Sequence, residues 1–248
     1  MLYKKNLARF MQFATLSLLA FQAQAFEMKP FSASYTADWS SLPFSGSAER
    51  SLTSTGNHQW QLSFNASMMV ASITEKSTFD YSSGQFRPQS YSYNRGGLGS
   101  SKKDAELSFD WKTKRIVNKS TSQPIAVPLD AKLLDKSTYQ MALQADVADG
   151  HKTMTYKVLD GDKVDTYHFK VLSEEAVDTK VGKLKAIKVE RIRDAKDEAK
   201  RQTTLWLAKN WNYMLIALTQ EEKGGKHYRI VLEKGTVAGT PIKPVKGR

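Results

Sequence analysis

Apolar and polar residues alternate along most of the chain, and this pattern predicts β-strands with one face in a core and the other in water. A strand of unusual length suits a curved or barrel-like sheet. The longest alternation runs over residues 60–70 and places these side chains on a single face: Trp60, Leu62, Phe64, Ala66, Met68 and Val70. Shorter alternations recur from Phe31 to Leu232, so we expect roughly a dozen strands.

Turn residues separate the alternating segments. Thr55-Gly56-Asn57 and Asp160-Gly161-Asp162 each join two such segments, and Gly, Asn and Asp tolerate the backbone angles of tight hairpins. Pro88 predicts an edge strand or a bulge, because proline donates no hydrogen bond to a neighbouring strand.

One segment, between Pro128 and Gly150, changes to a helical period. We expect a helix near residues 130–148, ended by Gly150. Ser137 and Gln140 fit a capping box at one start of this helix. The residues at helical spacing are Leu134, Thr138, Met141, Ala142 and Ala145.

Together these elements predict a mainly β protein. We expect an antiparallel sheet, curled into a half-barrel or barrel-like shape, with one main helix in the middle of the chain. Two sheets joined by the helix are the alternative. A single β-rich domain is expected over residues 26–234, followed by a disordered basic tail at residues 235–248 that is rich in Thr, Gly, Pro and Lys.

The first twenty-five residues have the order of a secretory signal peptide. Three positive residues, Lys4, Lys5 and Arg9, precede an apolar run at residues 10–21 that is too short to span a bilayer. Ala23-Gln24-Ala25 then supplies the small side chains that a signal peptidase accepts. We therefore expect cleavage after Ala25 and a periplasmic mature chain; a short buried helix is the alternative.

Charge and cysteine content narrow the range of partners. Loss of three positive residues on cleavage lowers the formal net charge from +12 to +9, and the chain has no cysteine, which excludes disulfides and the lipid attachment of bacterial lipoproteins. No later apolar run approaches the length of a transmembrane helix, so we expect no transmembrane segment after cleavage. An exported chain meets little nucleic acid. We expect no nucleic-acid partner, and the positive charge either faces an anionic envelope component or only keeps the protein soluble.

Several short segments, taken in order, resemble one bacterial exported family. They are Phe31–Tyr35, Leu134–Gln140, Tyr156–Gly161, Val181–Leu184 and Thr204–Asn210. Their order and spacing resemble the family known as domain of unknown function 3108, over nearly all of the predicted mature chain. The family often has Pro-Asp where this chain has Lys209-Asn210, which argues against an essential acid there. The resemblance implies an exported β-rich protein of a Gram-negative periplasm and brings no catalytic residues.

Metal and cofactor chemistry find little support. The four histidines, at positions 58, 151, 168 and 227, are scattered, and no thiolate is present to complete a zinc site. Asp160, Asp162 and Asp165 crowd a turn, but Val164 and Val171 stand where a calcium loop needs oxygen ligands. We expect an ordinary hairpin turn there, no metal site and no cofactor.

Nucleophilic catalysis is equally poorly supported. The chain has no Gly-x-Ser-x-Gly elbow, and thiol enzymes are excluded. Ser100 and Lys103 satisfy the Ser-x-x-Lys pattern, but they lie in a glycine- and serine-rich segment that reads as a hairpin loop. We therefore predict a non-enzymatic protein; a cluster of serine, histidine and carboxylate in the fold would revive a hydrolase.

The apolar face of the long strand either packs as a core or encloses a ligand. On the second interpretation the candidate ligand-binding residues are Trp60, Leu62, Phe64, Met68 and Met141. We predict a periplasmic binding or carrier protein for an apolar or lipid-like ligand. The alternative is a cell-envelope interaction module whose Trp and Tyr side chains and positive charge bind glycan, lipopolysaccharide or a protein partner.

Overall fold

The structure is a computed structural model and describes residues 26–39, 45–69, 71–82, 84–97, 104–193, 201–222 and 224–244. The predicted signal peptide at residues 1–25, its cleavage site and the Ser-x-x-Lys segment at 100–103 lie outside the described residues. Within the described ranges, no helix has the length and apolar character needed to cross a bilayer.

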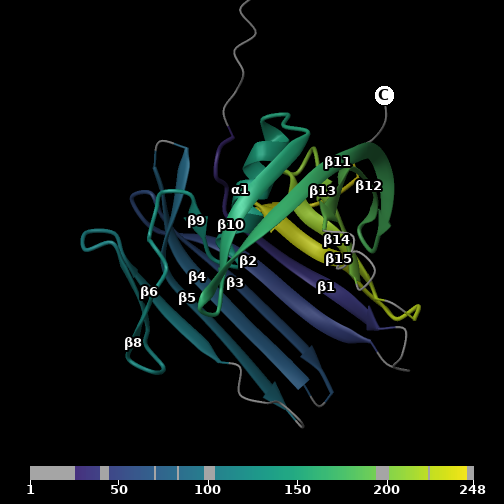
Figure 1. Ribbon diagram of the computed structural model, residues 1–248. Helices are drawn as coiled ribbons and strands as arrows, with labels where there is room; N and C mark the ends of the chain where they lie inside the picture. The colour runs from purple at the N-terminus through teal and green to yellow at the C-terminus, as the bar shows by residue number, and fades with distance from the viewer. Residues whose placement is uncertain are drawn as a thin grey trace, which may run out of the picture.

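One continuous sheet contains the strands of the described residues (Figure 1). The first eight are β1 (Phe31–Trp39), β2 (Gly46–Gly56), β3 (Gln59–Met68), β4 (Ala71–Ser82), β5 (Gln85–Gly97), β6 (Ala105–Asp110), β7 (Arg115–Asn118) and β8 (Gln123–Ile125). The others are β9 (Leu133–Leu134), β10 (Thr153–Asp160), β11 (Lys163–Thr179), β12 (Gly182–Ile192), β13 (Arg201–Ala208), β14 (Met214–Glu222), β15 (His227–Val237) and β16 (Thr240–Pro241).

The sheet is a long antiparallel ribbon whose two ends curl toward each other. Its order is β8-β7-β6-β5-β4-β3-β2-β1-β15-β14-β13-β12-β11-β10-β9, with β16 beside β15, and β9 is parallel to β10. β9, at one edge, lies close to β5 without being paired with it, so the sheet curls but does not close into a barrel. The predicted fold class, a mainly β antiparallel curled sheet with one main helix, is confirmed.

The turn residues act as expected. Asp160 pairs with Lys163 across the β10–β11 hairpin, and β2 turns into β3 after Gly56. The pairing of β4 with β5 shifts register beside Pro88, which is the bulge that proline predicts.

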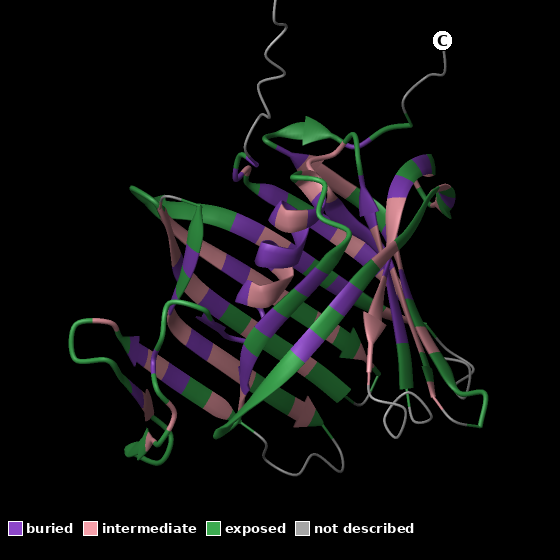
Figure 2. Ribbon diagram, turned by 45° about the horizontal axis from the view of Figure 1, so that its top comes forward, coloured by how far each residue is buried: buried purple, intermediate pink, exposed green. Residues whose placement is uncertain are grey.

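The helix α1 (Thr138–Ala148) lies on the concave side of the sheet (Figures 1 and 2). It begins later than predicted, because residues 133–134 form β9. Ser137 is the N-cap, but the predicted capping box is wrong, since the Ser137 side chain makes no capping hydrogen bond. The Asp135 carboxylate instead accepts the backbone N–H groups of Ser137 and Thr138, at 2.8 and 2.7 Å.

The prediction of a disordered tail from residue 235 is wrong for residues 235–244. β15 continues to Val237, β16 folds back onto it, and Ile242 is buried in the main core. The tail contains an apolar residue that reaches the core, which its polar composition concealed. Residues 245–248 lie outside the described range.

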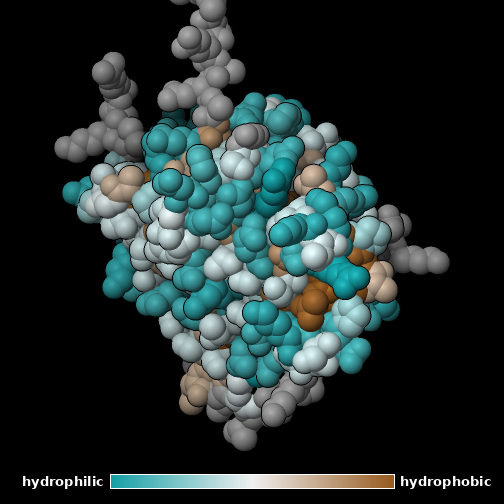
Figure 3. Space-filling view, turned by 90° about the vertical axis from the view of Figure 1, so that its left-hand side faces the viewer, coloured by the Kyte–Doolittle hydropathy of each residue, from teal (hydrophilic) through white to brown (hydrophobic). Residues whose placement is uncertain are grey.

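Burial along the concave face falls from one end of the strands to the other (Figure 2). On β4, the inward residues go from buried Phe79 and Ser77 to half-buried Glu75 and Ile73 and to exposed Ala71. The outer surface is dominated by hydrophilic side chains on the face shown in Figure 3. The apolar residues of the alternation therefore lie inside the curl, and only one end of the curl is fully packed.

Candidate functional site

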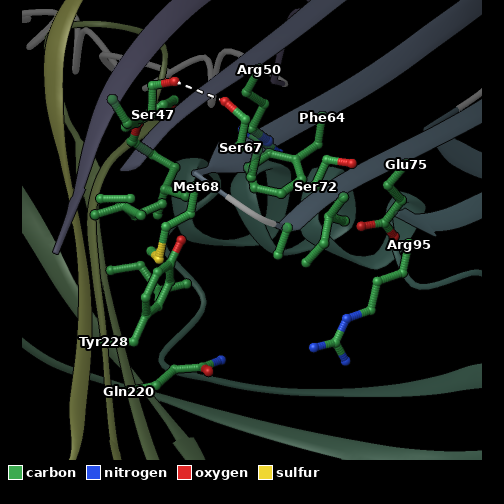
Figure 4. Close-up of a pocket in the computed structure, with 18 of the residues that line it drawn as sticks. Ser47, Arg50, Phe64, Ser67, Met68, Ser72, Glu75, Arg95, Gln220 and Tyr228 are labelled. Atoms are coloured by element: carbon green, nitrogen blue, oxygen red, sulfur yellow. Dashed lines mark hydrogen bonds between the residues drawn. The ribbon is translucent and has the colours of Figure 1, made fainter. Parts of the chain in front are cut away.

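A cavity of about 380 Å³ opens at the less buried end of the concave face (Figure 4). It lies among β1 to β5, β13 to β15 and the first turn of α1, which contributes Gln140. Polar and charged residues, among them Arg95, Gln220 and Lys226, line it together with apolar ones. The apolar lining comes from Ala37, Phe64, Ala66, Met68, Ala71, Ile73, Leu215, Leu218 and Ile230.

Cross-strand register explains where the cavity begins. Side chains of β2 to β5 stand in rows across the concave face. The Leu52 row holds Leu52, Leu62, Ser77 and Tyr91, the Arg50 row holds Arg50, Phe64, Glu75 and Tyr93, and the Ala48 row holds Ala48, Ala66, Ile73 and Arg95. Every residue of the Leu52 row is buried, whereas the cavity is lined from the Arg50 row outward.

We call the Leu52 row, with Trp60 and Phe79 beyond it, the covered end. The open end runs from the Arg50 row to Met68 and Ala71. Small side chains at Ala66 and Ala71 leave space at the open end that the large residues of the covered end fill.

The structure divides the five predicted ligand-binding residues between the two ends. Phe64 and Met68 line the cavity. Leu62 is 2% exposed and belongs to the packed core, and Trp60 packs against that core from a half-buried position. Met141, on α1, is fully buried and lines no part of the cavity.

The cavity also contains a residue that the sequence prediction missed. Arg50 lines the cavity although its side chain belongs to the core, and it is only 4% exposed. Its Nη2 atom lies 3.8 Å from the Met141 sulfur, its guanidinium lies 5.1 Å from the centre of the Phe31 ring, and its Nη1 has no hydrogen-bond partner. The signal was present in the sequence, because Arg50 occupies an inward position between Ala48 and Leu52.

Burial shapes the electrostatics around Arg50. Loss of water lowers the pKa of Arg50 below its ordinary value, and the nearby Tyr35, Tyr139 and Glu75 oppose this effect only in part. Burial also raises the pKa of Tyr35 to about 12, so its hydroxyl stays protonated and donates to the Leu215 carbonyl oxygen at 2.8 Å. Among the described residues, no carboxylate forms an ion pair with Arg50.

A hydrogen-bonded polar cluster separates the cavity from the covered end. Glu75 Oε1 accepts from the Tyr91 hydroxyl at 2.9 Å and from Ser137 Oγ at 2.8 Å. Behind it, fully buried Asp135 accepts from Ser77 Oγ at 2.6 Å and from Thr138 Oγ1 at 2.7 Å, besides the two backbone N–H groups. Burial raises the pKa of Asp135 to about 6 despite these four hydrogen bonds.

This polar cluster lacks the parts of a hydrolase. No histidine belongs to this cluster. His151 lies beside Asp146, and His168 is hydrogen-bonded to Thr155. His58 lies in the turn between β2 and β3, and His227 lies at the exposed rim of the cavity. The hydrogen bonds of the cluster hold the start of α1 against β4. The described residues also hold no group of three or more metal-ligating side chains.

Four tryptophans have described side chains, and they do not gather into a platform. Trp60 lies on β3 and Trp206 on β13, whereas Trp111 and Trp211 lie in turns, and none of the four lines the cavity. Three of their indole N–H groups donate to atoms of the protein, namely Trp111 to the Pro88 carbonyl, Trp206 to Glu175 and Trp211 to the Lys243 carbonyl.

A second hollow, of about 500 Å³, lies near the end of α1 and differs in chemistry. Its acids are already engaged, since Asp146 accepts from the Tyr156 hydroxyl at 2.6 Å and Asp149 from the Phe26 backbone N–H at 3.1 Å. Arg50 and the apolar lining therefore favour the first cavity as the functional site.

Comparison with known proteins places this fold in a family. A family model described as protein of unknown function (DUF3108) matches residues 34–233. The chain belongs to the DUF3108 family. The match confirms the resemblance found in the sequence. No curated protein matches the chain.

One of the solved structures similar to this chain has a similar overall fold. A beta-barrel-like DUF1849 protein from Brucella abortus is 14% identical, with a TM-score of 0.56 over 84% of this chain and 98% of that one. A putative exported protein with a YmcC-like fold from Bacteroides fragilis is 11% identical, over 86% and 98% of the two chains, with a TM-score of 0.32. A putative outer membrane lipoprotein-sorting protein domain from Vibrio parahaemolyticus is 10% identical, over 87% and 88%, with a TM-score of 0.24. At this identity the DUF1849 protein shows the fold alone, so function must be argued from the cavity.

Proposed function

We propose that this DUF3108 protein is a non-enzymatic periplasmic binding or carrier protein for an apolar or lipid-like ligand. The observation that carries the proposal is the apolar cavity at the open end of a face that is otherwise packed. A pocket with an apolar lining and a few polar groups is the usual form of a small-molecule site. Phe64 and Met68 supply apolar contacts, and exposed residues such as Arg95 and Lys226 stand at the mouth.

The volume limits the size of the ligand. A water molecule takes up about 30 Å³ in the liquid, and a methylene group roughly the same. A cavity of about 380 Å³ therefore holds on the order of a dozen such groups. One acyl-like chain would therefore fill the cavity, and a longer ligand would extend through its mouth.

The surroundings of Phe26 support the proposed export. Phe26, the first residue after the predicted cleavage site, is buried, and its backbone nitrogen lies 3.1 Å from Asp149 Oδ1. Cleavage after Ala25 would create a positive amino group at this nitrogen, next to a carboxylate. The mature chain would thus gain an ion pair at its new terminus.

A pair of substitutions on β3 tests the proposal. Ala66 points into the cavity, whereas the adjacent Asn65 is exposed on the other face. We expect Ala66→Trp to weaken binding of the neutral fluorescent probe N-phenyl-1-naphthylamine at least tenfold. Asn65→Trp, which adds the same side chain outside, should bind as the wild type does.

Two further measurements complete the test. Both variants should retain a cooperative unfolding transition, and native mass spectrometry of protein from an envelope fraction should show a bound apolar compound. Equal probe binding by folded Ala66→Trp and wild type would contradict the proposal.

The alternative function, an envelope interaction module, has less support because the tryptophans lie apart. Retention of both variants alike on envelope polymers at low salt would favour this alternative.

A further inference from the structure

Arg50 places a buried positive charge at the wall of the cavity. A guanidinium carries five N–H donors and stays protonated, so burial without acceptors is costly. Arg50 is 4% exposed and lines the cavity. Its Nη1 group has no hydrogen-bond partner in the protein. Figure 4 shows Arg50 behind Phe64, on the side of the cavity toward the helix.

The protein supplies only weak compensation for this charge. The buried Tyr35 hydroxyl is a neutral hydrogen-bond partner of the guanidinium, and the Met141 sulfur is a poor acceptor. The contact with the Phe31 ring is a cation–π interaction. Glu75 lies in the same cross-strand row, two strands away, but its Oε1 is held by Tyr91 and Ser137. The site therefore has an unused cationic donor, while its carboxylate is already engaged.

We infer that the ligand is a single-chain amphiphile with one anionic headgroup, which Arg50 binds at the inner end of the cavity. The inference rests on the proposed function and names the ligand class for the same site. A carboxylate or a phosphate matches the planar fork of a guanidinium, and both form short, charge-assisted hydrogen bonds with it.

The layout of the cavity fits such a ligand from headgroup to tail. From Arg50 the strand β2 runs four residues to Gly46, which is about 13 Å at the rise of a β-strand. The residues along this path, Phe64, Ala66 and Met68, are apolar. A chain of about a dozen carbons would fill the volume estimated above.

Ligands that differ only in the headgroup test the inference. The mature chain, stripped of bound lipid, is titrated with dodecanoate, dodecyl phosphate, dodecanol and dodecylamine, each competing with N-phenyl-1-naphthylamine. We expect at least one of the two anions to bind tenfold or more tightly than dodecanol. The tighter anion identifies the headgroup as carboxylate or phosphate.

Arg50→Met then removes the charge and keeps much of the side-chain volume. We expect the anion preference of this variant, defined as its affinity for the tighter anion divided by its affinity for dodecanol, to fall below threefold. Arg229→Met, on the exposed outer face of β15, is the matched control and should keep the full preference. Because the substitution removes an incompletely paired buried charge, the unfolding temperature of Arg50→Met should not fall.

Each other outcome has a defined meaning. If the wild type binds all four ligands alike, or prefers dodecylamine, the inference about the headgroup is overturned and the carrier proposal stands. If neither the probe nor any ligand binds the wild type, the carrier proposal itself fails. Should Arg50→Met not fold, Arg50→Gln replaces it, and a folded Arg50→Gln protein that keeps the anion preference would overturn the role of Arg50.

Discussion

The two ends of the concave face use the same strands in opposite ways. At the covered end, Leu52, Leu62 and Phe79 are at most 2% exposed and belong to the main core. At the open end, the same strands carry half-buried Phe64 and Met68 around a cavity. The strand pattern therefore defines an apolar face, and the position of α1 decides which part of that face is core.

Each end also holds a buried charged group, and the two groups differ in their partners. Asp135, at the covered end, accepts four hydrogen bonds from Ser77, Ser137 and Thr138. Arg50, at the open end, leaves Nη1 without a partner. Buried polar groups are generally satisfied, and the unpartnered Nη1 beside the cavity is the donor that the proposed anionic headgroup would bind.

The largest expected effect is a difference in stability between two positions on β3. Leu62→Ala should lower the free energy of unfolding by about 2–5 kcal/mol, because it leaves a cavity in the packed core. Met68→Ala, at the open end, should lower it by less than about 1 kcal/mol, because Met68 is half-buried beside an existing cavity. Urea unfolding of the two variants measures both values.

Probe binding should show the reverse order. Met68→Ala should change the affinity for N-phenyl-1-naphthylamine, and Leu62→Ala should leave it near the wild-type value wherever the protein is folded. Similar losses of stability at the two positions would show that the open end is packed as tightly as the covered end.

The sequence predicts the apolar face but not the boundary between these ends. Alternation places Trp60, Leu62, Phe64 and Met68 on one face, and the structure confirms that they share it. Which of them line the cavity depends on where α1 packs and on contacts between strands far apart in the sequence. Periodicity reports only the direction of a side chain along its own strand.

Long-range contacts also explain the other differences. Arg50 occupies an inward position that the pattern marks as core, yet its neighbour Met141 is 91 positions away in the chain. The backbone N–H groups at the start of α1 donate to the Asp135 carboxylate. The same carboxylate accepts a hydrogen bond from the hydroxyl of Ser77 on β4. Ile242 is buried in the core although the sequence around it resembles a disordered tail.

The second prediction concerns the pH dependence that Asp135 gives the covered end. Burial raises its pKa in the folded state to about 6, from an ordinary value of 3.8. Between these values the folded protein holds a proton that the unfolded chain has lost, so the stabilising contribution is complete below about pH 4 and disappears as the pH rises through 6. The loss amounts to on the order of 3 kcal/mol, at about 1.36 kcal/mol per unit of pKa.

Asp135→Asn isolates this contribution. The variant cannot ionise, so its free energy of unfolding relative to that of the wild type should increase as the pH is raised from 4 to 7, measured by urea unfolding at each pH. Asp178→Asn makes the same chemical change at an exposed position on β11 and should shift stability by less than about 0.5 kcal/mol. A pH-independent difference between Asp135→Asn and the wild type would mean that the four hydrogen bonds keep the carboxylate ionised.

The smallest effect belongs to the mouth of the open end, where charge acts on the rate of ligand entry. At the rim, Arg201 forms an ion pair with Glu222 at 2.6 Å. Arg95 and Lys226 also line the rim and do not belong to this ion pair. Arg95→Gln should slow the association of dodecanoate about two- to threefold at low salt, since exposed charges steer ligands mainly through the rate of encounter. Stopped-flow displacement of the probe measures this rate.

At about 0.5 M salt the difference between Arg95→Gln and the wild type should vanish, because charges are then screened over a few ångströms. Arg87→Gln makes the same change on β5 away from the cavity and should leave the rate unaltered. A slowing by Arg95→Gln that persists at high salt would instead indicate direct contact with the ligand, and the anionic headgroup would then bind at the mouth and not at Arg50.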